Sequence, residues 1–152
     1  MGKRKTTTLA CAAFAALCIV PAAAGQNDAT ASDILAMERK ALDGFQAGDP
    51  NPCLAMADPA ITYFHIVTGK RLDGLPALKA LFDNYRGRSL FDSYEMADPQ
   101  VQIAGDAAVL TYILVRHVGT EVTRWNSTQV YQRKKEGWRV IHSHWSMNQP
   151  SQ

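Results

Sequence analysis

The chain has 152 residues, a formal net charge of +2, 47% hydrophobic residues and 20% charged residues. This length suits one domain and is too short for a protein kinase, a Rossmann dehydrogenase or a TIM barrel. The composition is that of an ordinary globular protein, which excludes a disordered, collagen-like or disulfide-scaffold chain.

The positive charge is concentrated at the start of the chain. Without Lys3, Arg4 and Lys5 the sequence holds 13 basic against 14 acidic residues, a net charge of −1. A protein that binds nucleic acid needs excess positive charge for the phosphate backbone. We therefore expect no nucleic-acid partner.

Residues 1–24 have the three parts of a signal peptide. The basic residues come first, an apolar stretch runs from Leu9 to Val20, and small residues end it at Ala22-x-Ala24. The apolar stretch is too short to span a bilayer comfortably, although an uncleaved anchor is the alternative. We expect a mature chain from about Gly25, a periplasmic or secreted location, and no stable membrane insertion once the leader is cleaved.

Cys53 is the one cysteine beyond the leader, because Cys11 and Cys18 lie within it. A single cysteine cannot form an intramolecular disulfide, and a buried small hydrophobe is its simplest interpretation. A role as nucleophile would need an activating base beside it.

Three helices are expected in the first half of the chain. After a polar tail over residues 25–31, Ser32 caps the first helix, which ends near Gly48. The second is short, from Asn51-Pro52 to Met56, and the third covers residues 75–85. The apolar stripe of the first helix consists of Ile34, Leu35, Ala41, Leu42 and Phe45.

Strands are expected at residues 61–67, 91–96 with a continuation or bend over 99–103, 107–118, 122–134 and 138–147. Helices come first and an antiparallel meander comes last. This order predicts an α+β fold, with three N-terminal helices packed on a curved antiparallel sheet. One domain would cover residues 32–148.

Four parts of the chain carry a resemblance to a known superfamily: residues 48–49 with 56–64, residues 73–75, residues 98–108, and residues 128–131 with 137–146. The chain resembles the nuclear transport factor 2-like superfamily and, within it, the association (hub) domain of calcium/calmodulin-dependent protein kinase II (CaMKII). SnoaL-like bacterial stand-alone proteins share this architecture. The resemblance implies a cone-shaped fold, a cavity between helices and sheet, and dimers or larger rings. It implies neither kinase nor calmodulin-binding activity.

In the hub domain, three arginines line the cavity and can hold small carboxylates. Leu114, Gln129 and Trp145 occupy the matching positions, so we expect a nearly neutral pocket. Strand alternation and the resemblance together give the expected lining side chains: Cys53, Tyr112, Leu114, Arg116, Gln129, Tyr131, Ser143 and Trp145. Such a pocket suits a small, mostly apolar ligand. The alternatives are that the aromatic residues simply fill the core and that Arg116 is a solvated edge residue.

The opposite face of the last strand is expected to carry Trp138, Val140, His142 and His144 as a self-association interface. The His142-x-His144 spacing would suit two metal ligands, but no third ligand motif accompanies it, so no metal is expected.

Three functions fit the sequence. The first is a self-associating cone domain that binds a small apolar or aromatic ligand without catalysis. The second is a cofactor-independent enzyme of the ketosteroid-isomerase or SnoaL kind, which would use His65 or Glu95 as its base. The third is a purely structural hub. None of the three calls for a cofactor.

Overall fold

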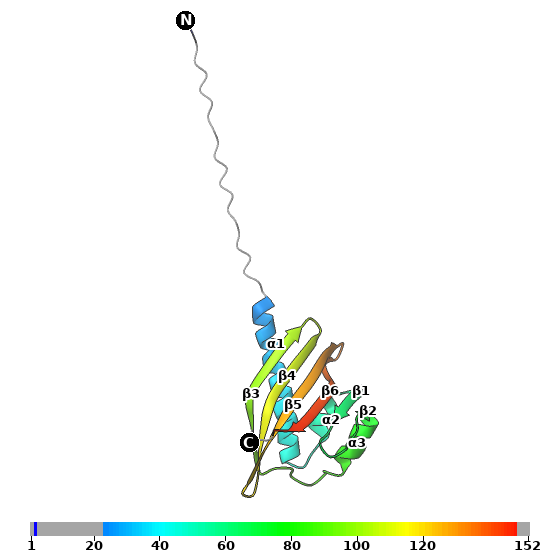
Figure 1. Cartoon of the computed structure of the whole chain (residues 1–152). Coiled ribbons are helices and arrows are strands. Elements are labelled where there is room, and N and C mark those ends of the chain that lie inside the picture. Colours follow the sequence, from blue (N-terminus) through cyan, green and yellow to red (C-terminus); the bar gives the residue numbers. More distant parts are fainter. Residues whose placement is uncertain (1, 3–22, 149–152) are drawn as a thin grey trace.

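A computed structural model describes residue 2 and residues 23–148. Three helices precede most of the strands (Figure 1). The elements in chain order are α1 (Ala23–Gln46), α2 (Asn51–Met56), β1 (Ala57–Phe64), β2 (Leu72–Asp73), α3 (Leu75–Asp83), β3 (Ser93–Ala104), β4 (Ala107–Val118), β5 (Glu121–Lys134) and β6 (Gly137–Met147). The predicted α+β arrangement is confirmed, and α2 has its predicted bounds.

The strands form one six-stranded sheet in the order β2-β1-β6-β5-β4-β3. All neighbouring strands pair antiparallel except β1 and β6, which run parallel. The expected antiparallel sheet is therefore mixed at this one junction, because β6 returns at the end of the meander in the direction of β1. Short β2, which the sequence analysis did not predict, covers the outer edge of β1.

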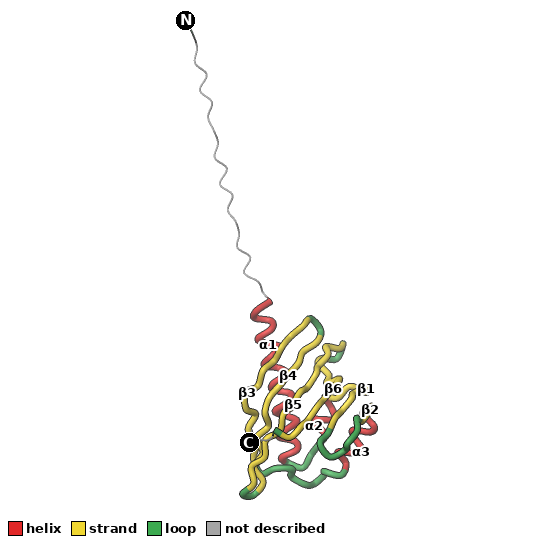
Figure 2. The backbone as a smooth tube through the Cα atoms, viewed as in Figure 1, coloured by secondary structure: helices red, strands yellow, loops and turns green. Residues whose placement is uncertain are grey.

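The helices cover one face of the curved sheet, as Figures 1 and 2 show. α1 lies along the sheet, whereas α2 and α3 lie near the β1–β2 end. Gly44 lets α1 approach the start of α2, because a Cβ atom there would lie only 2.5 Å from the carbonyl oxygen of Asp49. The hydrophobic core fills the space between this helical layer and the concave face of the sheet.

α1 begins at Ala23 rather than at Ser32, so the predicted polar tail over residues 25–31 is part of the helix. A tertiary contact accounts for the difference. Thr30 is buried, and its hydroxyl accepts a hydrogen bond of 3.3 Å from the guanidinium of Arg133 on β5. The predicted signal peptide lies outside the described residues apart from residues 2, 23 and 24.

A β-bulge in β6 shifts the alternation of its side chains. Val130 pairs with His142 but Tyr131 pairs with Val140, which leaves Ile141 as the extra residue. Trp138 and Val140 therefore face the helices and are buried in the core. The prediction that these two residues belong to an exposed interface is wrong, because it assumed uninterrupted alternation along the strand.

Candidate functional site

A cavity of about 270 Å³ lies under the helices, and we call it the outer compartment. Its walls come from α1, α3, the end of β1 and the middle strands of the sheet. Most of the lining is aromatic or aliphatic: Leu42, Phe45, Tyr63, His65, Ile66, Val67, Phe82, Tyr85, Leu90, Phe91, Leu114, Arg116, Trp125 and Trp145. Among these lining side chains only His65, Arg116 and the tyrosine and tryptophan rings carry polar atoms, so the space favours apolar contents.

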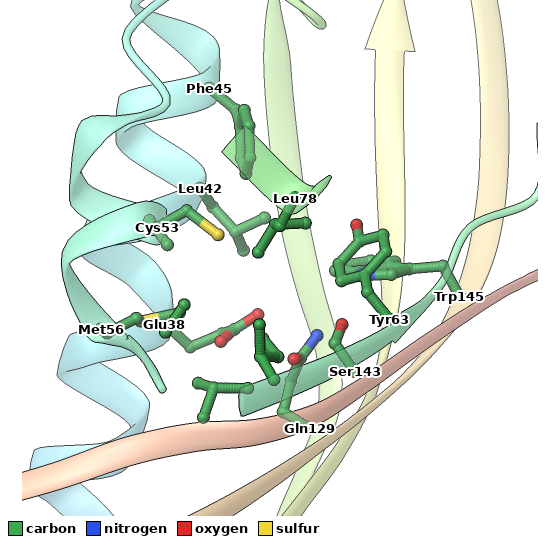
Figure 3. Close-up of a pocket in the computed structure, with 14 residues that line it drawn as sticks. Glu38, Leu42, Phe45, Cys53, Met56, Tyr63, Leu78, Gln129, Ser143 and Trp145 are labelled. Atoms are coloured by element: carbon green, nitrogen blue, oxygen red, sulfur yellow. The ribbon is translucent and has the colours of Figure 1, made fainter. Parts of the chain in front are cut away.

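A second and much narrower space, the inner compartment, adjoins the first. It measures about 20 Å³, room for about one water molecule. Leu42, Phe45, Tyr63 and Trp145 line both compartments and so form the boundary between them. Figure 3 shows Glu38 on one side of this space and Gln129 and Ser143 on the other.

Glu38 is a buried acidic residue between α1 and the sheet. It lies on the side of α1 that faces the sheet and is only 2% exposed. Each of its carboxyl oxygens accepts a hydrogen bond. The donors are the hydroxyls of Tyr112 at 2.6 Å and of Tyr131 at 2.7 Å. These two bonds join α1 to β4 and β5.

Burial raises the pKa of the Glu38 carboxyl, because desolvation disfavours the charged form. The two tyrosine hydrogen bonds act in the opposite direction but are the smaller effects. Burial likewise raises the pKa of the Cys53 thiol, and the nearby Glu38 raises it further. Cys53 is therefore a protonated thiol in the wall of the inner compartment rather than an activated nucleophile.

Ser143 leaves an unsatisfied polar atom at the inner compartment. Its hydroxyl is buried without a hydrogen-bond partner, whereas the amide of Gln129 donates to Ser127 at 3.0 Å. A buried hydroxyl without a partner is costly, so a water molecule or a ligand oxygen would be stabilised here.

The structure divides the eight predicted lining residues into two groups. Six line the compartments: Cys53, Gln129, Ser143 and Trp145 the inner one, and Leu114, Arg116 and again Trp145 the outer one. Tyr112 and Tyr131 line neither compartment, because their hydroxyls engage Glu38 and their rings pack in the core.

The two candidate bases lie in different surroundings. Glu95 is exposed on β3, so the expectation that it faces the cavity is wrong. His65 lies just beyond β1, lines the outer compartment and stacks on Tyr63 at 5.9 Å between ring centroids. Burial lowers the pKa of His65, and the charge of Arg116 lowers it further.

The acid that does face the cavity is Glu38, which the sequence analysis missed. A signal for it was present: Glu38 lies four residues after Ile34 and four before Leu42, on the apolar stripe of its helix.

His142 and His144 lie on the convex face of the sheet, as predicted from the strand pattern. The Nδ1 atom of His142 lies 2.7 Å from the hydroxyl oxygen of Thr62, and the ring of His144 lies 5.5 Å from that of Phe64. Within residues 23–148 no group of three potential metal ligands is found. In the same part of the chain, no helix has the length and apolar character needed to cross a membrane.

Residues 30–149 match the family model of the calcium/calmodulin dependent protein kinase II association domain. Among curated proteins, no relative matches the sequence.

Solved structures place the chain in the nuclear transport factor 2-like cone fold. A candidate ketosteroid isomerase from Parabacteroides distasonis is 30% identical, with a TM-score of 0.69 over 77% of this chain and 86% of that one. The CaMKII hub of S. rosetta is also 30% identical, with a TM-score of 0.64 over 76% and 94% of the two chains. An NTF2-like protein of unknown function from Pseudomonas putida, at 24% identity and a TM-score of 0.71 over 78% and 87%, shows the fold alone.

Proposed function

Because the chain belongs to the CaMKII association-domain family, we propose that it is a self-associating cone domain whose cavity binds a small, mostly apolar ligand. The observation that carries the proposal is the outer compartment. A well-packed core leaves few voids larger than a water molecule, whereas this one measures about 270 Å³. An apolar cavity of about 150 Å³ already accommodates benzene. The ligand is therefore one aromatic ring or an aliphatic group of similar size, with a short substituent.

Isothermal titration calorimetry with 3-phenylpropanamide, a neutral single-ring probe, tests this function. We expect saturable binding of one molecule per chain. Leu90→Trp, which places a large ring in the compartment wall, should abolish it. Ile113→Trp, on the convex face of β4, is the matched control and should bind like the wild type. The absence of saturable binding to the wild type, both of this amide and of its acid 3-phenylpropionate, would refute the proposal.

Glu38 favours an enzymatic role as the second candidate, with this acid in place of His65 or Glu95. A buried carboxyl with a raised pKa beside a cavity is a common form of catalytic base. We rank binding first because both Glu38 oxygens already accept hydrogen bonds from tyrosines, a structural arrangement. The enzymatic role would require Glu38-dependent exchange of the acidic protons of phenylacetone with D2O, measured by NMR. Exchange at the same rate in Glu38→Gln would exclude it.

Export to the periplasm or beyond is the third part of the proposal and depends on the leader sequence alone. Cleavage after Ala24 would give a mature chain that starts at Gly25, within the first turn of α1. Intact mass spectrometry of the exported protein should give this mass. A soluble periplasmic species that retains Lys3 to Lys5 would contradict the prediction.

A further inference from the structure

Arg116 is the one residue with a permanent charge among the described residues that line the outer compartment. It is half-buried on β4 and faces apolar walls. No aspartate or glutamate lines the compartment, and none of the ion pairs found within residues 23–148 includes Arg116. A half-buried cation without an anionic partner is costly, so its retention needs an explanation.

The guanidinium of Arg116 is held in place by its neighbours. Its central carbon lies 4.3 Å from the ring centroid of Trp125 and 5.6 Å from that of Phe91. One terminal nitrogen, Nη2, donates to the carbonyl oxygen of Leu90 at 2.5 Å. Because a guanidinium carries five N–H groups, this contact leaves donors free. Arg116 is thus held in one orientation before a ligand binds, and it keeps N–H donors free for that ligand.

A second donor on the same wall also lacks an acceptor. The indole nitrogen of Trp125 is buried and makes no hydrogen bond, although tryptophan usually finds a partner for it when buried. His65 packs edge-on against Trp125, with 6.2 Å between ring centroids. Since burial and Arg116 lower the pKa of His65, it adds no second charge at neutral pH. The net charge presented to a ligand is that of Arg116 alone.

We propose that the ligand of the outer compartment is an apolar monocarboxylate, with its carboxylate on Arg116 and its apolar body between the aromatic walls. The proposal rests on the ligand-binding function above and specifies its chemical class. One negative charge would neutralise the one cation, and a carboxylate matches the fork geometry of a guanidinium. The expectation of a nearly neutral pocket followed from the loss of the three hub arginines, whereas the positive charge of this pocket belongs to Arg116.

The test compares 3-phenylpropionate with its neutral isostere 3-phenylpropanamide by titration calorimetry at pH 7. We expect the wild type to bind the acid at least about tenfold more tightly than the amide, the effect of one charge-assisted hydrogen-bonding contact. Propionate, which has the carboxylate without the ring, should bind much more weakly than either. In Arg116→Gln the acid should lose its advantage, while the affinity for the amide changes little.

The wild-type comparison decides the proposal even if Arg116→Gln fails to fold. Equal binding of acid and amide would overturn the carboxylate assignment and leave the apolar-ligand function standing. Binding of neither probe would overturn both. If Arg116→Gln folds and keeps the preference for the acid, another group supplies the recognition and the assignment is wrong. Arg116→Lys, which keeps the charge but not the fork, should retain part of the preference.

Discussion

Glu38 connects helix and sheet through a single side chain. Its two tyrosine partners lie on neighbouring strands, so one carboxyl fixes the height and rotation of α1 over β4 and β5. The same contacts explain why Tyr112 and Tyr131 face the helices without lining either compartment. At these positions the core interpretation of the aromatic residues is correct, and the ligand-lining interpretation is not.

The raised pKa of Glu38 predicts a particular pH dependence of stability. The folded chain holds this proton more tightly than the unfolded chain, whose pKa is about 4.3. The contribution of Glu38 is therefore most favourable below the unfolded pKa and is lost as the pH rises through the folded pKa. In urea unfolding at pH 5 and pH 8, we expect the wild type to lose more stability than Glu38→Gln between the two values. An equal loss would mean that the folded-state pKa is not raised.

Glu38→Ala serves as the companion variant. It removes the acceptor from two buried tyrosine hydroxyls, and each unsatisfied hydroxyl costs about 1–3 kcal/mol. We expect a loss of about 2–6 kcal/mol in the free energy of unfolding, larger than that of Glu38→Gln, whose amide oxygen still accepts one bond. Similar losses in the two variants would show that neither the hydrogen bond that glutamine keeps nor the side-chain volume that alanine removes contributes much.

The resemblance to the hub domain placed Gln129 and Trp145 at the cavity, and strand alternation, a local rule, extended this prediction from Trp145 to Ser143. All three residues line the inner compartment. Glu38 was missed because an acidic residue in a helix is usually solvated. The local sequence does not indicate that two tyrosines far along the chain donate hydrogen bonds to it.

At the scale of elements, the bulge at Ile141 shows where the alternation of side chains along a strand fails. Before the bulge the core side chains of β6 fall on even positions, and after it they fall on odd ones. The one glycine of β6, Gly137, is its first residue, and the strand contains no proline, so neither residue type signals the shift at Ile141. The extra residue follows from the pairing of β6 with both β5 and β1, which is a tertiary property.

The early start of α1 leads to a prediction about residues that resemble a tail in the sequence. Ala29 is exposed in the helix interior, and the next residue, Thr30, is buried against Arg133. Proline at position 29 removes a helical hydrogen bond and clashes with the preceding turn, at a cost of about 3 kcal/mol. We expect Ala29→Pro to lower the melting temperature clearly, as measured by circular dichroism.

Ala29→Gly is the control for this substitution and should cost only about 1 kcal/mol. A melting temperature unchanged by proline would mean that residues 25–31 add nothing to the stability of the folded domain, as expected of a polar tail.

At the scale of the whole molecule, the helices protect one face of the sheet and leave the convex face open. On that face Phe64 is 41% exposed and packs against His142 and His144, which forms an aromatic patch across β1 and β6. Burial and the neighbouring His144 lower the pKa of His142. His142 therefore adds no charge to the patch at neutral pH, a property that suits association, and the patch remains after Trp138 and Val140 are reassigned to the core.

Self-association through this patch, defined by Phe64, His142 and His144, gives the last prediction. A second copy related by a twofold axis would bury the same aromatic groups on both chains. We expect at least a dimer at micromolar concentration by light scattering. His144→Glu places a charge in the desolvated contact and should raise the dissociation constant at least about tenfold. Ala80→Glu adds the same charge on an exposed position of α3 and should leave the dissociation constant unchanged. A monomer at micromolar concentration would exclude self-association, whereas equal weakening by the two variants would place the interface away from this patch.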